Sequence, residues 1–527
     1  MISGWGRTSL AVALLVGLGG ETRGQDRAPP VIGVVEILSR EVFDERVDGL
    51  SAPYRLGNTV HVRTRDRVVA RELLFATGDP LDQELVEQTE RNLRALPFLR
   101  DARIEITEVD VDQDGHPDRV DVRVTTWDRW SLAPRFDLSQ VEDHTIWEIG
   151  ASEKNLFGWG KAVTVSHRVN LDRTTDQVVY EDHQFFGSRV GLTAAMANLS
   201  DGHEQFLLLD RGHLSLQDPW AVSLGGGGFS RTDPLFEGGE EISRLRHRAQ
   251  WGDVEVGRAI RRRGDHALRV HGAYRWRDED VGDDRRDFGI AEIGLRSVSH
   301  RFVRLTHVNQ FERTEDINLG ALSYVTLGLS SPALGGQAGQ IAILSTGYGR
   351  GIPLGEQHFV LADVSFQGRH ERGGWRNALT QVGGRYLRKH ALRHALVGRA
   401  QYRQGHNLDP EIQLLLGAET GLRGYSVRQF AGDRSFLLSM EERWFLADDI
   451  GQVLSLGAAA FIDSGFVWPV GAPFNLGDLK TGIGVSLLIG SNRLSSRGGV
   501  RVDLGYGLNA VPGSNRWVLV AGSDIRF

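Results

Sequence analysis

The sequence predicts a mainly β protein: a transmembrane antiparallel β-barrel of about 16 strands, preceded by one small α/β domain. Three observations carry this prediction. The start of the chain has the layout of a secretory signal, residues 31–128 mix helical and strand patterns, and residues 130–527 alternate apolar and polar side chains. After the signal, no apolar stretch reaches the length that a membrane-spanning helix requires.

The composition excludes several kinds of site and partner. The chain has 527 residues, more than one ordinary globular core holds. Hydrophobic residues make up 40% and charged residues 24%, which is typical of folded proteins. Cysteine is absent, which excludes disulfides, thiolate metal sites, a cysteine nucleophile and a lipoprotein anchor. The formal net charge of −7 gives no general basic field, so we expect no nucleic-acid partner.

Residues 1–24 have the pattern of a signal peptide. Arg7 precedes an apolar run from Leu10 to Leu18, and small and polar residues follow to Gly24. This run is too short to span a bilayer as a helix. A buried N-terminal helix is the alternative, but the order of basic, apolar and small residues favours export.

Residues 31–128 are expected to form a compact α/β domain. Strands are expected at 31–37, 102–109 and 119–126, which are rich in β-branched residues, and two helical patterns separate the first strand from the others. The element order is therefore strand, helix, helix, strand, strand. Such a sheet has helices on one face and exposed edges.

The second helix of this domain carries clear boundary signals. Asp79 is the expected N-cap, Pro80 suits the first helical position, and Asp82 stands where a capping box places an acid. Leucines then recur on one face, and Pro97 ends the helix.

Beyond Trp130, period-2 alternation replaces the helical pattern. It is clearest in four segments: 266–276, 358–369, 395–403 and 500–506. Apolar-out, polar-in alternation is typical of transmembrane barrel strands, and about 16 strands fit at roughly 25 residues per strand plus connection. A soluble β-sandwich or propeller is the alternative. No repeat of fixed period supports it, and a charged face recurs strand after strand.

Four short motifs follow one another along this region. They are Glu153–Gly160 (EKNLFGWG), Leu422–Tyr425 (LRGY), Glu441 within SMEER, and Phe461–Gly465 (FIDSG). Together they resemble motifs of the BamA/TamA superfamily of outer-membrane insertases, which is related to the two-partner-secretion transporters. The α/β domain resembles a POTRA domain. The resemblance covers nearly the whole mature chain.

The resemblance implies an inner-loop lock. Arg423, Gly424 and Tyr425 match the loop that folds back into the barrel in this superfamily, and Asp463 and Glu441 match acids on the strands that receive it. The residues agree with this. Asp463 lies opposite the Ile462 face of its strand and Glu441 opposite Met440, so both acids can point inward on neighbouring strands. An arginine fork suits bidentate pairing with a carboxylate. We therefore hypothesise that Arg423 pairs with Asp463, with Glu441 nearby. An extracellular turn is the alternative for this segment.

Two further features follow from the resemblance. Glu153, Asn155, Gly158 and Gly160 resemble the first barrel strand of the superfamily. Phe527 matches a terminal aromatic residue that acts as an insertion signal, and an aromatic end also suits an interfacial girdle.

The implied function is insertion of β-barrel proteins into the outer membrane of a Gram-negative bacterium. The N-terminal domain would lie in the periplasm and capture unfolded client proteins by strand addition. Outer-membrane lipid and periplasmic accessory proteins are further expected partners. One alternative is a dedicated two-partner-type exporter of a single secreted protein, and another is a passive porin or receptor. The chain has room for one POTRA-like domain, which argues against the role of a central assembly machine.

A separate pattern concerns a cation. Acids recur at alternate positions before Gly115 with the spacing of a calcium loop, the residues being Asp110, Asp112, Asp114, Asp118 and Asp121. Structural calcium is the prediction, and a solvated Asp-Gly hairpin turn is the alternative.

We expect no enzyme activity and no other cofactor. Asp463-Ser464-Gly465 matches an aspartic-protease triplet, but the chain holds no second triplet to supply the partner carboxylate. No Gly-x-Ser-x-Gly elbow, His-Glu-x-x-His or P-loop occurs. A surface hydrolase is therefore the least supported reading.

Overall fold

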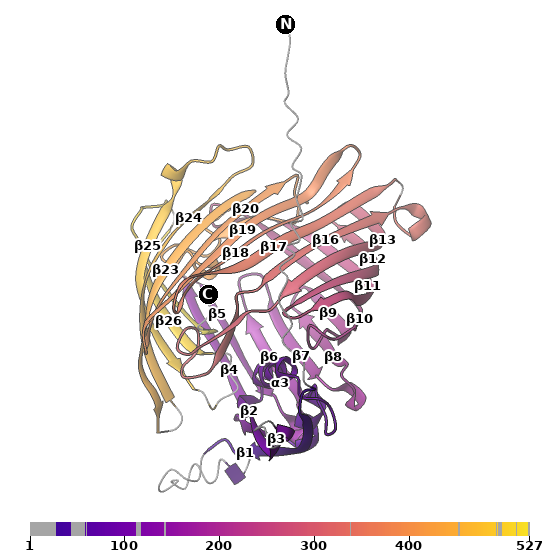
Figure 1. Cartoon of the computed structure of the whole chain (residues 1–527). Coiled ribbons are helices and arrows are strands. Elements are labelled where there is room, and N and C mark those ends of the chain that lie inside the picture. The colour runs from indigo at the N-terminus through magenta and orange to yellow at the C-terminus, as the bar shows by residue number, and fades with distance from the viewer. Residues whose placement is uncertain are drawn as a thin grey trace.

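The computed structural model describes residues 28–43, 58–59, 61–111, 117–141, 144–337, 339–451, 454–491, 493, 498–512 and 514–524. The predicted signal peptide, Asp112, Asp114 and Phe527 lie outside these residues. A small α/β domain lies below one end of a large closed barrel (Figure 1).

The N-terminal domain is a three-stranded sheet with two helices. Its elements are β1 (Val31–Arg40), α2 (Asp66–Glu72), α3 (Gln83–Ala95), β2 (Leu99–Val111) and β3 (Pro117–Asp128). The sheet order is β1-β3-β2, with β1 parallel and β2 antiparallel to β3. Apolar side chains of both helices and all three strands form its core, among them Ile32, Val69, Leu93 and Val124. The element order is as predicted.

Helix α3 begins three residues later than the sequence predicts. Its N-cap is Asp82, whose side chain accepts hydrogen bonds from the amides of Glu84 and Leu85. The predicted N-cap, Asp79, instead accepts one from the Ala76 amide. The reason is pairing with β1: the Ile32 amide donates to the Asp79 carbonyl, which keeps this segment extended.

The barrel has 20 strands in the described part of the chain, not 16. They are β4 (Leu132–Val141), β5 (His144–Glu153), β6 (Lys161–Val169), β7 (Thr174–Asp182), β8 (Gly191–Leu199), β9 (Gly202–Arg211), β10 (Trp220–Glu237), β11 (Glu240–Arg263), β12 (His266–Val281), β13 (Asp284–Ser299), β16 (Ala321–Ser330), β17 (Ile341–Gly355), β18 (His358–Glu371), β19 (Gly374–Ala391), β20 (His394–His406), β23 (Arg434–Ile450), β24 (Leu454–Trp468), β25 (Lys480–Gly490), β26 (Gly498–Gly507) and β27 (Trp517–Asp524). The estimate failed because β4 to β9 are only 9 or 10 residues long and short turns join several of them, so more strands fit.

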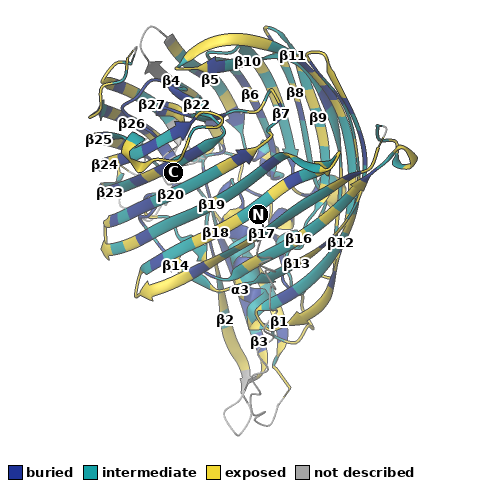
Figure 2. Ribbon diagram, turned by 90° about the horizontal axis from the view of Figure 1, so that it is seen from above, coloured by how far each residue is buried: buried dark blue, intermediate teal, exposed yellow. Residues whose placement is uncertain are grey.

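Each barrel strand pairs antiparallel with its neighbours, and β27 pairs with β4 to close the ring. An even number of strands returns the chain to the end that carries the N-terminal domain. Two short hairpins lie outside the barrel ladder: β14 (Phe302–Leu305) with β15 (Glu315–Asn318), and β21 (Leu414–Leu416) with β22 (Phe430–Gly432). Seen from above, the β21–β22 segment lies within the ring (Figure 2).

The barrel wall is apolar outside and polar inside. On β25, Ile483, Val485 and Leu487 are exposed, whereas Ser486 between them is buried. On β23 and β24 the fully buried inward residues include charged groups such as Glu441 and Asp463. This inversion of the soluble-protein pattern confirms the predicted alternation. Among the described residues, no helix is long and apolar enough to cross a membrane.

Candidate functional site

The loop between β20 and β23 folds into the barrel. It spans residues 407–433, contains the β21–β22 hairpin and carries Arg423 at its innermost turn. Leu416, Leu422 and Tyr425 are buried against the wall residues Leu437 and Val467. These apolar contacts hold the loop in the lumen of the barrel. The alternative interpretation of the LRGY segment as an extracellular turn is therefore wrong.

Arg423 forms the predicted pair with Asp463. Its Nε and Nη2 donate to the two carboxylate oxygens of Asp463, each at 2.8 Å, and its backbone amide adds a third hydrogen bond at 3.2 Å. Its guanidinium also lies 3.5 Å from the ring centre of Phe461, in cation–π geometry. Both members of the pair are buried, Arg423 at 5% and Asp463 at 0% exposure. The bidentate geometry fixes the position of the loop tip.

Glu441 is the centre of a wider charge network. Arg423 donates to it from Nη1 at 2.8 Å, Arg443 from Nε at 2.7 Å, and Arg501 from both Nη atoms at 2.9 and 2.6 Å. Asp503 pairs in turn with Arg501 at 2.7 Å. Three arginines thus balance three buried acids, as burial of charge requires. Sequence reasoning placed Glu441 here but missed Arg443 and Arg501.

The tip of the loop packs closely against the barrel wall, and glycines on both sides make this close approach possible. Gly424 has φ +122°, and a Cβ there would lie 2.9 Å from the Tyr506 carbonyl carbon. A Cβ on Gly482 would come within 2.5 Å of the Arg423 carbonyl oxygen. Beside them, the Tyr425 hydroxyl donates to the Thr481 carbonyl at 2.8 Å. All five predicted residues of the inner-loop lock are therefore brought together.

A second insert enters the barrel from the opposite end and was not predicted. The β14–β15 hairpin connects β13 to β16 at the end near the N-terminal domain. Its Leu305 and Val308 pack with the inward wall residues Phe359, Leu387 and Val397. The hairpin is therefore held inside the mouth of the barrel by apolar contacts.

The two inserts are linked through Arg443. Its Nη1 donates to the Val308 carbonyl at 2.7 Å, while its Nε donates to Glu441. Glu315 orders the same stretch by accepting from the amides of Val308 and Asn309 at 3.1 and 2.7 Å. A continuous chain of polar contacts thus runs from the hairpin to the arginine lock.

The hairpin also binds the N-terminal domain. Arg94 of α3 donates to both carboxylate oxygens of Asp316, at 2.9 and 2.8 Å. Arg304 lies 3.1 Å from Glu90 of the same helix. The hairpin therefore stands between the domain and the interior of the barrel, in contact with both.

The predicted first-strand motif lies elsewhere than expected. Glu153 ends β5, the second strand of the barrel, and the remaining residues form the turn to β6. The Asn155 side chain accepts from the Gly160 amide at 2.7 Å and donates to Thr64 of the N-terminal domain at 2.8 Å. The Arg65 amide donates to the Gly158 carbonyl at 3.0 Å. The motif is therefore a docking turn, because its polar groups face the N-terminal domain rather than another strand.

Gly158→Ala should loosen this docking. Gly158 has φ +74°, and an added Cβ would lie 2.4 Å from the Arg63 carbonyl oxygen, so the backbone must shift. We expect about 1–3 kcal/mol less docking stability. Hydrogen exchange of residues 61–65 measures it, and Gly264→Ala, at a positive φ of +51° with open space around it, is the control. Equal exchange in both variants would contradict the docking role.

The docking should also depend on pH through His300. This residue follows β13, stacks edge-to-face on Phe302 at 5.1 Å, and lies near Arg91 of α3 and Arg269. Burial, and then these two arginines, lower the pKa of His300 from 6.5 to about 4. A lowered histidine pKa means that its stabilising effect is complete above pH 6.5 and is lost as the pH falls toward 4.

We therefore expect α3 to exchange amide hydrogens faster at pH 5 than at pH 7.5, after correction for the intrinsic rate. His300→Gln, which cannot be protonated, should flatten this dependence. A wild-type chain whose α3 protection does not change between these pH values would contradict the assignment.

The calcium pattern stays a prediction. Asp112 and Asp114 lie outside the described residues, as does the side chain of Asp110. Of the others, Asp118 is exposed, and Asp121 accepts a hydrogen bond from the Val34 amide at 2.8 Å.

Comparison with protein-family models and with curated proteins returned no match. Among solved structures, BamA from Haemophilus ducreyi lacking POTRA domains 1–3 matches 93% of this chain and 84% of its own at 12% identity, with a TM-score of 0.39. CdiB from Acinetobacter baumannii matches 93% of this chain and 73% of its own at 14% identity and a TM-score of 0.43. CdiB from Escherichia coli matches 93% and 76% at 14% identity and a TM-score of 0.44. Each of these three matches covers most of this chain at low identity.

Proposed function

We propose that this chain is an outer-membrane barrel that inserts other β-barrel proteins into the outer membrane, with its N-terminal domain in the periplasm. The observation that carries the proposal is the arginine lock. Arg423, Glu441 and Asp463 belong to three motifs that are separate in the sequence, and they meet in one buried network. A passive porin does not need a loop that is held inside the barrel by a buried ion-pair network. The exposed aliphatic band of the wall supports placement in a bilayer.

The seam of the barrel favours insertion. Strands β27 and β4 are joined by three registered pairs in the described residues, whereas β10 and β11 share eighteen. A short ladder is the easiest part of a sheet to open, and its backbone groups can pair with an incoming strand. Client strands would be templated there, and client folding with membrane burial would supply the energy. The proposed reaction needs no covalent step and no cofactor.

The N-terminal domain supplies a second strand-pairing surface. In its sheet order β1-β3-β2, both β1 and β2 are edges, and residues 78–81 already pair with the start of β1 at Ile32. An unfolded client segment can add to such an edge through main-chain hydrogen bonds. Periplasmic accessory proteins are further candidates for the same edges.

Export of one dedicated protein is the second candidate. The observation that favours it is the β14–β15 hairpin, whose contacts with α3 include the ion pairs of Arg94 and Arg304. Such a plug could move aside for a chain that passes through the lumen. A passive porin is disfavoured, because inserts enter the lumen from both ends.

Depletion of the protein separates the two candidates. We expect many unrelated outer-membrane barrels to fall together when the membrane and secreted proteomes are quantified side by side. Loss of a single secreted or surface protein, with the other barrels unchanged, would instead establish a dedicated exporter. No change in either proteome would leave only the porin or receptor.

A further inference from the structure

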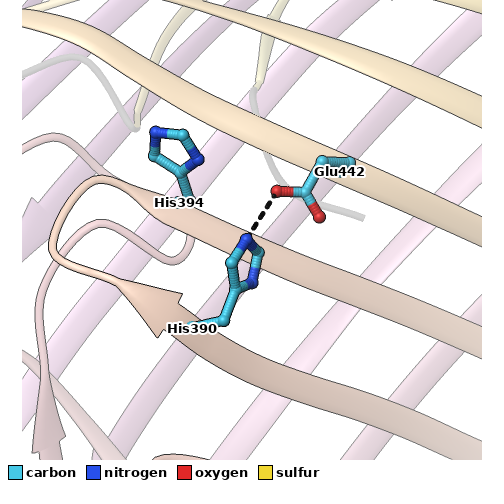
Figure 3. Close-up of side chains that lie close together, drawn as sticks. All are labelled: His390, His394 and Glu442. Atoms are coloured by element: carbon cyan, nitrogen blue, oxygen red, sulfur yellow. Dashed lines mark ion pairs between the residues drawn. The ribbon is translucent and has the colours of Figure 1, made fainter.

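Three side chains on the outer face of the barrel form a candidate metal site. His390 lies near the end of β19, His394 begins β20, and Glu442 lies on the adjacent strand β23 (Figure 3). One ligand atom from each lies within 4.8 Å of the other two. The His390 Nε2 is 3.1 Å from the Glu442 Oε1. We propose that these residues bind a zinc ion.

A β-bulge aligns the two histidines. In the ladder between β19 and β20, Lys389 pairs with Ala395 and Ala391 pairs with His394, so His390 is the extra residue. A bulge changes the direction of the bulged side chain. Here it allows His390 to lie beside His394, as Figure 3 shows.

Glu442 faces outward while Glu441 faces the lumen. It pairs in register with Leu396 of β20, and its neighbour on the same face, Trp444, pairs with His394. A carboxylate on the outward face of a membrane barrel is disfavoured, though only modestly near the end of a strand, and a bound cation compensates its charge.

The ligand set and spacing fit zinc. Two imidazoles and one carboxylate are a common zinc ligand set, and zinc–ligand distances of 2.0–2.2 Å place ligand atoms about 3.4 Å apart in a tetrahedron. The His390 Nε2 and the Glu442 Oε1, 3.1 Å apart, are near this spacing, and a ring nitrogen of His394 lies within 4.8 Å of both ligand atoms. Because both histidines lie beside the turn between β19 and β20, at the end of the strands, water can reach the ion and complete the coordination. Calcium and magnesium prefer all-oxygen sites and should bind poorly.

The position of the site gives zinc a structural role. Strands β20 and β23 are the two strands that flank the lumenal loop of residues 407–433, and the site joins them at the end near the N-terminal domain. A metal that binds the folded barrel and not the unfolded chain raises its stability with metal concentration. The ion would therefore clamp two strands whose far ends are joined by the loop that carries Arg423.

The test uses the full-length, tag-free protein in detergent micelles, first stripped with a chelator. Calorimetric titration with zinc should give one ion per chain, and zinc should raise the temperature at which the folded band is lost on semi-native gels. The double variant His390→Ala/His394→Ala should lose both effects, and Glu442→Gln should weaken binding at least tenfold. His406→Ala, an exposed histidine at the other end of β20, is the matched control and should behave as the wild type.

The folding of each variant is checked by its gel mobility without metal. Titration of the folded wild type without saturation in the micromolar range would overturn the proposal. So would an unchanged zinc effect in a folded double variant. Neither result tests the proposed insertion of other β-barrel proteins, which the depletion experiment tests separately.

Discussion

Arg423→Ala should lower the free energy of unfolding of the barrel by about 3–5 kcal/mol, the usual effect of removing one partner from a buried ion pair. Asp463 is fully buried and takes two side-chain hydrogen bonds and one backbone hydrogen bond from Arg423. Without the guanidinium its charge loses its main partner, and the loop tip loses the contact that holds it against the wall. Denaturant unfolding followed by gel mobility measures the effect.

Three further variants define the mechanism. Arg423→Lys keeps the charge but not the planar fork, so we expect an intermediate loss. The double variant Arg423→Ala/Asp463→Ala should lose less than the sum of the two single variants, because both remove the same interaction. Arg263→Ala, at an exposed position at the end of β11, is the control. If Arg423→Ala is no less stable than Arg263→Ala, the lock does not stabilise the barrel.

The sequence was sufficient to predict the Arg423–Asp463 pair. Alternation fixed which side of each strand faces inward, and the resemblance supplied the loop that brings Arg423 to Asp463. Arg501 was missed for a physical reason: it reaches Glu441 from β26, and the side chains of different strands that meet in the lumen depend on strand number and register, which local patterns do not determine. Arg443 lies two residues from Glu441 on the same face of β23, so alternation alone could have placed it in the network.

The main error of the sequence prediction was the number of barrel strands, and it too arises from the limits of local patterns. Short strands with tight turns give a weak signal each, so an average length per strand underestimates their number. The β14–β15 hairpin escaped prediction because each of its strands has four residues and its apolar side chains bury against the barrel rather than against each other. The α3 N-cap was displaced by tertiary pairing with β1.

Replacing residues 302–318 with a short Gly-Ser turn should open the barrel to ions. Barrels of 16–18 strands enclose an aqueous channel unless something fills it, and a barrel of 20 strands is wider. The hairpin occupies the mouth near the N-terminal domain through Leu305 and Val308, and the loop of residues 407–433 enters from the other end. Each insert alone should therefore reduce conductance only in part.

Single-channel recording in planar bilayers tests this arrangement. We expect low conductance for the intact chain, a larger value when either insert is removed, and a porin-like value when both are removed. Leu392→Ser, in the neighbouring turn between β19 and β20, is the control and should conduct as the intact chain does. Removal of the hairpin also removes the contact between Val308 and Arg443, so the stability of that variant reports the coupling of the two inserts. A folded hairpin-less barrel with unchanged conductance would show that the lumenal loop alone closes the channel, and the hairpin would then serve only to dock the N-terminal domain.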